Sequence, residues 1–286
     1  MNVASRAFRF ISPALPPELI LQIQTWRKVG YWPDLKNPKR FTEKVQSRKL
    51  HDRDPRLPVL IDKVLVKDHV RNKLGDAWVN PTLWSGKKLP PVAERSWTVP
   101  YVIKPHHAST WMIFVKESVC DWSAIEAACD QWMKTRWDPL LLEWAYSQID
   151  PKILIEPYLG PPVETPLDYK FYVFSGRAEY IAADTDKSTC TKRRFFNRDW
   201  VPQQLQLSWP REFRDIPKPR HLGAMLEAAE ILGTGFSFVR IDLYDVDRPM
   251  FGEMTFYPGS GYGPFDPQSF DWAFGRLWVL PDRPSH

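Results

Sequence analysis

The sequence predicts an α+β protein in which short strands pair into antiparallel sheets. From about residue 99 onward the apolar side chains follow a period of two in short runs, which is typical of strands. Tight turns join several of these runs and only a few helices separate them, so hairpins are favoured over a doubly wound parallel sheet. The 28 prolines, several in adjacent pairs, argue against a helical bundle or a coiled coil.

The first third of the chain is predicted to be mainly helical. Asn37 followed by Pro38 is typical of an N-cap and a first helical turn, so we expect a helix from this point to Leu50. A second helix is predicted over residues 57–73, with its stop signal at Gly75. Both helices precede every predicted strand.

Strands and helices alternate in the remainder of the chain. The strands are predicted over residues 101–104, 112–115, 152–159, 168–174, 177–184, 237–244 and 250–256. Helices are expected over residues 121–137 and 219–232. We therefore divide the chain into a helical N-terminal region, a small subdomain and a C-terminal subdomain, with the bounds 1–95, 96–160 and 161–286.

Composition narrows the class of protein. Hydrophobic residues make up 43% of the 286 residues, so a full core is expected and general disorder is excluded. The net charge is +5, but 34 acidic residues are interleaved with 39 basic ones, which fits a small polyanionic substrate better than nucleic acid. The basic run over residues 187–198 fits either an anion-binding segment or a solvated hairpin.

Cysteine usage and hydropathy indicate the compartment. Cys120, Cys129 and Cys190 have no metal-ligand spacing, which favours a reducing environment. No window of the sequence has the apolar length of a membrane span. We therefore expect a cytoplasmic protein, with a basic face suited to rest on a membrane assembly.

One predicted hairpin carries the strongest chemical signal. In its first strand Ile241 and Leu243 point to one face, and Arg240 and Asp242 point to the other. On the return strand Glu253 would lie opposite Asp242, with Cβ atoms about 5 Å apart. Two opposed carboxylates repel unless a cation lies between them, and their hard oxygen donors suit magnesium that also binds phosphates.

The same residues admit a simpler explanation. Arg240 alone would neutralise Asp242 and Glu253 in a solvated salt-bridge cluster. The segment that follows the hairpin, Pro258-Gly259-Ser260-Gly261, is suited to present backbone amides to a developing oxyanion. It is equally consistent with an ordinary glycine turn.

Several segments resemble ATP-grasp enzymes such as D-alanine:D-alanine ligase. In chain order they are Asp62-Lys63 with Lys67, Pro100-Tyr101-Val102-Ile103-Lys104-Pro105, Ile155-Glu156-Pro157-Tyr158-Leu159, Arg240-Ile241-Asp242, and Glu253-Met254-Thr255 with Pro258-Gly259. The resemblance implies an ATP-grasp fold, with two α+β subdomains that enclose a nucleotide. It also implies ATP and Mg²⁺ as cofactors.

A more specific resemblance is to the teichuronopeptide-biosynthesis branch of ATP-grasp proteins. It rests on Asn37-Pro38-Lys39, Phe41-Thr42-Glu43-Lys44, Asp168-Tyr169-Lys170-Phe171 and Glu253-Met254-Thr255-Phe256-Tyr257-Pro258-Gly259-Ser260-Gly261, and runs from about residue 35 to the C-terminus. This branch is often encoded with surface-polysaccharide machinery. The resemblance implies a ligase that joins a carboxylate, as a small molecule or on a glycan, to an amine through an acyl phosphate.

The resemblance also implies roles for particular residues. Lys67 and Lys104 are expected at the phosphates, and Glu156, Tyr158 and Leu159 at the adenine. Asp168 is expected at a ribose hydroxyl and Lys170 at the nucleotide, while Asp242, Glu253 and Thr255 would hold magnesium. The catalytic groups would be Arg240 and the amides of Gly259 and Ser260, at the oxyanion of the tetrahedral intermediate.

The chain departs from the family pattern in the loop over the phosphates. That loop is usually rich in glycine, but here it reads His106-His107-Ala108-Ser109-Thr110. His107 and Ser109 would supply side-chain donors in place of glycine amides. The alternative is that both are loop residues with no ligand contact.

Two rival functions remain open at this point. A sugar-modifying transferase or kinase would use the same nucleotide cradle with a hydroxyl acceptor. A non-catalytic nucleotide-binding or glycan-binding protein would explain the missing glycines and the 14 tryptophans, which stack well on sugars.

Overall fold

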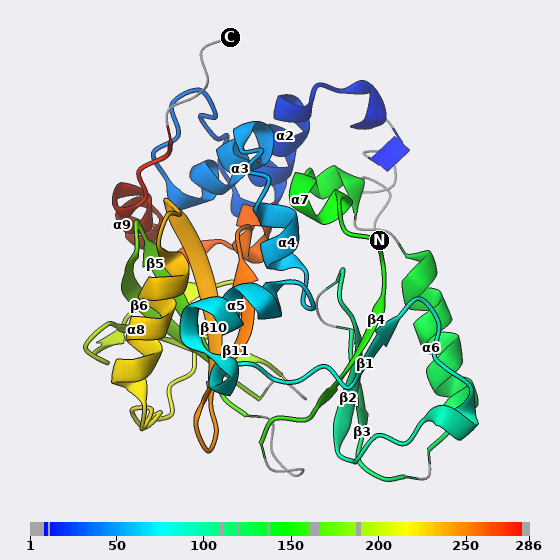
Figure 1. Ribbon diagram of the computed structural model, residues 1–286. Coiled ribbons are helices and arrows are strands. Elements are labelled where there is room, and N and C mark those ends of the chain that lie inside the picture. Colours follow the sequence, from blue (N-terminus) through cyan, green and yellow to red (C-terminus); the bar gives the residue numbers. More distant parts are fainter. Residues whose placement is uncertain are drawn as a thin grey trace.

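Two antiparallel sheets carry the fold (Figure 1). The computed structural model describes residues 9–10, 12–108, 111–118, 120–135, 138–160, 166–186 and 190–281. Every pairing between its strands is antiparallel, so the predicted α+β class is confirmed. Among these residues, each helix is too short or too polar to cross a bilayer.

The elements have the following bounds. The α-helices are α2 (Pro17–Val29), α3 (Phe41–His51), α4 (Leu57–Ile61), α5 (Val66–Leu74), α6 (Trp122–Lys134), α7 (Trp144–Ser147), α8 (Leu222–Gly233) and α9 (Ser269–Leu277). The strands are β1 (Trp84–Gly86), β2 (Tyr101–Pro105), β3 (Ile113–Val115), β4 (Ile153–Pro157), β5 (Asp168–Phe174), β6 (Arg177–Thr185), β7 (Lys192–Asn197), β8 (Pro202–Gln203), β9 (Gln206–Leu207), β10 (Phe238–Asp245), β11 (Pro249–Thr255) and β12 (Phe265–Asp266). Short 3-10 helices are η1 (Ser12–Ala14), η2 (Asp76–Trp78), η3 (Val92–Glu94), η4 (Pro139–Leu141) and η5 (Pro258–Gly261).

The first sheet has the strand order β1-β4-β2-β3 and packs one face on α6 (Figure 1). Tyr101 and Ile103 of β2 point toward Ile125 of α6, because alternate residues of a strand share a face. Lys104, next along the strand, points away from this small core. β1 lies within the range predicted to be helical, so this sheet begins before residue 96. The three-part division of the chain stays a prediction.

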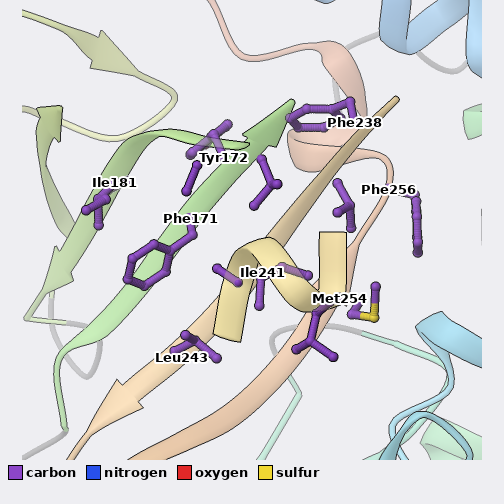
Figure 2. Packing of buried hydrophobic residues seen from close by; sticks show 14 of the residues in the cluster. Phe171, Tyr172, Ile181, Phe238, Ile241, Leu243, Met254 and Phe256 are labelled. Carbon is purple, nitrogen blue, oxygen red and sulfur yellow. The ribbon is translucent and has the colours of Figure 1, made fainter. Parts of the chain in front are cut away.

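The second sheet has the order β11-β10-β5-β6-β7-β8, and its apolar face packs on α8. Figure 2 shows Phe171, Ile241 and Met254 on neighbouring strands of this core, and all three side chains are buried. The alternation predicted for β10 is confirmed, because Ile241 and Leu243 are buried here while Arg240 faces the other way into a cavity. A bulge between Asp242 and Leu243 gives β11 one extra residue opposite β10.

Helix α3 connects the N-terminal region to the end of the second sheet. Its Phe41 ring packs edge-on against Phe238 and Phe274, with centroids 5.0 and 5.7 Å away. The buried Arg48 guanidinium donates to the carbonyls of Phe238 (2.9 Å) and Phe256 (3.1 Å). α3 therefore holds the adjacent ends of β10 and β11.

Helix α9 lies directly against α3. Thr42 Oγ1 donates to the buried Asp271 carboxylate at 2.7 Å. A Cβ added at Gly275 would meet the Lys39 carbonyl oxygen at 2.0 Å. Only glycine allows this close backbone approach.

Two helix boundaries differ from the prediction. α3 begins at Phe41 and not at Pro38, because the Glu43 carboxylate accepts from the amides of Lys39 (2.8 Å) and Arg40 (2.9 Å) and fixes the first turn there. The helix predicted over residues 57–73 is split into α4 and α5. Asp62 causes the break, since its Oδ1 accepts from the next two turn amides, those of Val64 (2.8 Å) and Leu65 (3.1 Å).

The basic run near residue 190 forms β7 where the structure describes it. Phe195 and Phe196 are buried in the sheet, and the Arg193 guanidinium is buried against Asp184. The described part of this run is therefore the second strand of a hairpin with β6, and it is partly buried in the second sheet and not fully solvated.

Candidate functional site

A cavity of about 1060 Å³ lies between the two sheets, and the predicted site residues converge on it. Those that line it are Lys67, Lys104, Glu156, Tyr158, Leu159, Asp168, Lys170, Arg240, Asp242, Glu253, Thr255, Gly259 and Ser260. They come from α5, β2, β4 and the two residues after it, β5, β10, β11 and η5, so the fold gathers segments separated by up to about 190 residues. His107 is not among them, and Ser109 lies outside the described residues.

On the first-sheet side, Glu156 lies between the two predicted phosphate lysines. Its Oε1 is 2.5 Å from Lys67 Nζ, and its Oε2 forms an ion pair with Lys104. Burial alone would raise the pKa of Glu156, but the charges of Lys104 and Lys67 outweigh it and lower that pKa. The Glu156 carboxylate thus forms ion pairs with both lysines in this structure. The predicted contact of Glu156 with adenine stays a prediction.

Aromatic residues form the wall beside these lysines. The Tyr158 ring stacks on Phe114, with centroids 4.2 Å apart and planes at 28°. Both residues line the cavity together with Leu159. Phe114 was missed by the sequence reasoning, because one aromatic residue in a short strand is an ordinary core signal. The pair gives a flat apolar surface of the kind on which a purine stacks.

On the second sheet, Lys170 is surrounded by carboxylates. Its Nζ lies 2.5 Å from Asp168 Oδ2, 2.6 Å from Asp242 Oδ2 and 3.8 Å from Asp184 Oδ2. Burial would lower the pKa of Lys170, but Asp168 and Asp242 raise it above its ordinary value. A permanently charged lysine therefore stands at the centre of the polar face of this sheet.

The predicted register of the hairpin is confirmed, since Asp242 pairs with Glu253 across β10 and β11. The Arg240 guanidinium reaches both acids, with Nη2 2.7 Å from Asp242 Oδ2 and 3.1 Å from Glu253 Oε1. Nη2 also lies 3.0 Å from Thr255 Oγ1. Arg240 is buried, so the cluster is an internal charge network and not the solvated one considered from sequence.

Glu253 is the most accessible acid of this network. About a third of its side chain (34%) is exposed, and it lines the cavity. Burial would raise its pKa, but the charges of Lys63, Arg240 and Lys170 lower the pKa of Glu253 to about 2. The carboxylate is therefore ionised throughout the neutral range.

The donor set fits a magnesium ion that shares its coordination shell with phosphates. Asp242, Glu253 and Thr255 offer hard oxygen atoms, which magnesium prefers. Within the described ranges, no group of three or more His, Cys, Asp or Glu side chains is arranged to hold a metal on its own. Oxygen atoms from a bound phosphate would have to complete the shell.

The loop after β11 has an unusual backbone. Gly259, Ser260 and Gly261 have φ values of 55°, 55° and 68°, and Ser260 is the one residue of the three that carries a side chain in this left-handed region. The Ser260 amide donates to the Tyr257 carbonyl at 2.8 Å. The prediction that this amide binds an oxyanion is therefore wrong. The Gly259 amide has no hydrogen-bond partner among the described residues.

The predicted ligand contact of His107 is also wrong. Its ring is buried 6.0 Å from the His106 ring and does not reach the cavity. Burial and the His106 charge lower the pKa of His107, whereas a phosphate contact would raise it. His106 holds this turn in place, with Nδ1 3.0 Å from Asp62 Oδ2 and Nε2 2.8 Å from the Asp150 carbonyl.

Lys63 also lines the cavity, although no role was predicted for it from the sequence. Its Nζ donates to the carbonyl of Ala108, a residue of the predicted phosphate loop, at 2.9 Å. Its charge is the largest influence that lowers the pKa of Glu253. Its neighbours in space lie 45 and 190 residues away in sequence, so the local segment Asp62-Lys63 gave no role for this side chain.

Solved structures offer only distant similarity. They include D-alanine–D-alanine ligases from Bacillus anthracis (17% identity, TM-score 0.43, 77% of this chain and 65% of that one) and Helicobacter pylori (15%, 0.43, 78% and 62%). The macrocyclase MdnC from Microcystis aeruginosa, bound with precursor peptide MdnA, matches at 15% identity and a TM-score of 0.37 over 80% of this chain and 64% of that one. The chain thus spans less than two thirds of each of these proteins. No curated protein sequence matches it.

The family model gives the decisive match. The model described as TupA-like ATPgrasp covers residues 43–279, which include both sheets, α9, all of α3 except its first two residues, and every cavity residue discussed above. Together with the antiparallel sheets that enclose the cavity, this coverage places the whole site within one family domain. The chain belongs to the TupA-like ATP-grasp family.

Proposed function

We propose that this protein is an ATP- and Mg²⁺-dependent ligase that joins a carboxylate to an amine through an acyl phosphate. Membership of the ATP-grasp family supports ATP-dependent carboxylate–amine ligation as the general class. The observation that carries the proposal is the single cavity between the sheets. It brings Lys67 and Lys104 on one wall together with Arg240, Asp242 and Glu253 on the other.

The lysine wall is suited to bind the phosphates. Lys67 and Lys104 now neutralise Glu156, and each ammonium has further N–H donors that a phosphate oxygen can accept from. The stacked pair of Phe114 and Tyr158 on the same side offers an apolar place for the base. This wall therefore orients the nucleotide.

The carboxylate wall is suited to hold magnesium. Asp242, Glu253 and Thr255 would be its protein ligands. When bound, magnesium neutralises phosphate charge and favours attack on the terminal phosphorus. Ion pairs with Arg240 and Lys170 hold the acids in place whether or not a metal is present.

In the second half of the reaction an amine attacks the acyl carbon, and negative charge develops on its oxygen. Arg240 lines the cavity as a fixed cation, and the Gly259 amide is a donor without an internal partner among the described residues. Both would stabilise that oxyanion. Phosphate leaves and an amide remains.

We further propose that the carboxylate belongs to a sugar acid or an amino acid used in surface-polysaccharide synthesis, at a membrane-associated assembly. The resemblance of residues 253–261 to the teichuronopeptide branch supports this choice. Trp111 and Trp209 also line the cavity, and indole rings pack well on sugar rings.

The test is ADP release with Mg²⁺ and ATP, screened over sugar acids and amines in pairs. Release that requires both a carboxylate and an amine supports the ligase. Release that requires a hydroxyl acceptor, with no need for an amine, identifies a kinase instead. Nucleotide binding with no release across the screen identifies a binding protein.

A further inference from the structure

The buried Lys49 lies beneath the loop Pro258–Gly261 and forms no ion pair among the described residues, although the buried Glu143 is close enough to influence its charge. Lys49 of α3 is 1% exposed, and no carboxylate in the part of the chain that the structure describes lies within 4 Å of its ammonium. Charged lysines are rarely buried unless an acid neutralises them. Lys49 therefore calls for an explanation that packing does not give.

The contacts of Lys49 are concentrated on one residue of the cavity wall. Its Nζ lies 2.8 Å from Ser260 Oγ and 2.7 Å from the Ser260 carbonyl oxygen. The Tyr262 ring covers it at 4.3 Å. Gln46 Nε2 also donates to the Ser260 carbonyl, at 3.1 Å, so the loop keeps a second attachment to α3.

The backbone holds the Ser260 side chain at this place against its own preference. A φ of 55° is unfavourable for a residue with a Cβ, whereas the neighbouring Gly259 and Gly261 take the same left-handed region without that cost. Such strain persists where the surrounding structure requires it. Here the left-handed backbone places Ser260 in the cavity wall and its hydroxyl in contact with Lys49.

The surroundings favour a neutral amine. Burial and the charge of Lys28 of α2 lower the pKa of Lys49 and the nearby Glu143 raises it, and together they bring that pKa to about 7. Lys28 lies 4.2 Å from the centroid of the Tyr262 ring, to which Lys49 is also close. A neutral Lys49 has a lone pair that accepts the Ser260 hydroxyl proton, while its own N–H donates to the Ser260 carbonyl.

Resting on the ligase activity proposed above, we propose that Ser260 and Lys49 together accept the proton that the amine substrate loses as it attacks the acyl phosphate. Ser260 lines the cavity and contacts the substrate, and Lys49 acts through it as a positioning residue. The pair is distinct from Arg240 and Gly259, which stabilise charge and move no proton.

The step balances without another reactant. The amine nitrogen bonds to the acyl carbon, the bond from that carbon to the phosphate oxygen breaks, and phosphate leaves with the electron pair. The amine proton passes to Ser260 Oγ while the hydroxyl proton of Ser260 passes to Lys49 Nζ. Lys49 ends as an ammonium and later returns the proton to water through the same hydroxyl.

The test uses phenylmethanesulfonyl fluoride, which reacts with serines that a neighbouring base activates, so it needs no knowledge of the substrate. Peptide mass spectrometry of the full chain gives the labelling rate of Ser260 from about pH 6 to 9. We expect the rate to rise through about pH 7, because the neutral lysine is the active form. Ser208 is the internal control, since it shares the cavity wall and a φ of 66° but accepts no lysine hydrogen bond among the described residues.

Two lysine variants test whether the labelling of Ser260 depends on Lys49. Lys49→Met should lower the rate about 100-fold, as expected for loss of a general base. Lys28→Met should leave the plateau rate unchanged and move the midpoint to higher pH, since the Lys28 charge lowers the pKa of Lys49. The Lys28 variant is the control for the loss of a cation beside Tyr262 that forms no hydrogen bond with Ser260 in the part of the chain that the structure describes.

The outcomes are decisive even if Lys49→Met does not fold. A wild-type Ser260 that is unlabelled, or that is labelled no faster than Ser208, or whose rate does not change with pH, overturns the proposal. The melting shift with Mg²⁺ and ATP is measured separately. If Ser260 is not labelled but the melting shift is present, the proposal for Ser260 and Lys49 is wrong and the proposed ligase function stands. If Ser260 is labelled but the melting shift is absent, the proposed ligase function is wrong and the activated Ser260 stands.

Discussion

Asp242 and Glu253 face each other across β10 and β11, and Arg240 Nη2 donates to both, at 2.7 and 3.1 Å. Two acids so close together need a cation between them. Because Arg240 supplies it from the same strand, the hairpin is stable before any ligand arrives. Most of the predictions below concern the charges that meet in this cavity.

Arg240→Met should leave Asp242 and Glu253 without their shared partner. Breaking a buried ion pair from one side costs about 3–5 kcal/mol, so the free energy of unfolding should fall by that order. Mg²⁺ without nucleotide should raise the melting temperature of this variant more than that of the wild type, because the freed acids can bind it. The exposed Arg220→Met is the control, and an Arg240 variant as stable as the control would contradict the network.

Glu253→Gln should abolish the part of the ATP-induced melting shift that depends on magnesium while the protein stays folded. The amide keeps the shape of the side chain but loses the charge that a divalent ion requires. Glu227→Gln, on the exposed side of α8, should bind nucleotide as the wild type does. A magnesium-dependent shift that survives in Glu253→Gln would remove Glu253 from the metal site.

Lys104→Ala should weaken ATP binding about tenfold or more and leave adenosine binding nearly unchanged, since a charge-assisted bond to phosphate contributes about 1.5–3 kcal/mol. Calorimetry with both ligands checks this, with the exposed Lys88→Ala as control. Equal losses for ATP and adenosine would show that Lys104 supports the pocket only through Glu156.

His107 should affect stability and not nucleotide affinity. Burial lowers its pKa in the folded protein, so the unfolded state takes up a proton first and the free energy of unfolding should fall as the pH drops below about 6.5. His107→Gln should flatten this dependence in denaturant titrations at several pH values, whereas the exposed His51→Gln should not. An ATP affinity that changes with pH in the wild type and not in His107→Gln would return His107 to the site.

Gly275→Ala and Gly223→Ala should change stability in opposite directions, although both glycines lie in helices. At Gly275 the new Cβ would meet the Lys39 carbonyl oxygen at 2.0 Å, so we expect a loss of about 2–4 kcal/mol. At the exposed Gly223 no atom lies within 4 Å, and a gain of about 0.5–1 kcal/mol is expected. Thermal unfolding of the two variants tests whether α9 rests on α3 as described.

The hairpin of the site was predictable because its information is local. A period of two fixes which residues share a face, and a turn centred on residues 247 and 248 predicts Asp242 opposite Glu253. The observed turn pairs Leu243 with Phe251, and the bulge at Gly252 brings Asp242 and Glu253 together. The loop chemistry was less predictable. The Ser260 amide donates to the Tyr257 carbonyl because three consecutive residues have positive φ values. Two of them are glycines, which commonly take such values, but a serine in the sequence does not indicate a positive φ.

Helix α3 shows why other parts of the site could not be predicted. Its sequence predicts a helix but gives no sign that Arg48 and Lys49 are buried. Their partners, Phe238 and Ser260, lie 190 and 211 residues further along the chain. No local pattern carries information about contacts over that distance.

The same separation has a consequence for biosynthesis. When α3 leaves the ribosome, the strand end that Arg48 holds is still 190 residues from being made, which at 5–20 residues per second is a wait of roughly 10–40 s. Throughout that interval Arg48 and Lys49 are hydrated cations on a nascent segment, and their desolvation comes only when β10, β11 and η5 are complete. Closure of the cavity is therefore one of the last events of folding, and a slow long-range one by contact order. A ribosome stalled before residue 238 would carry a chain without a competent site.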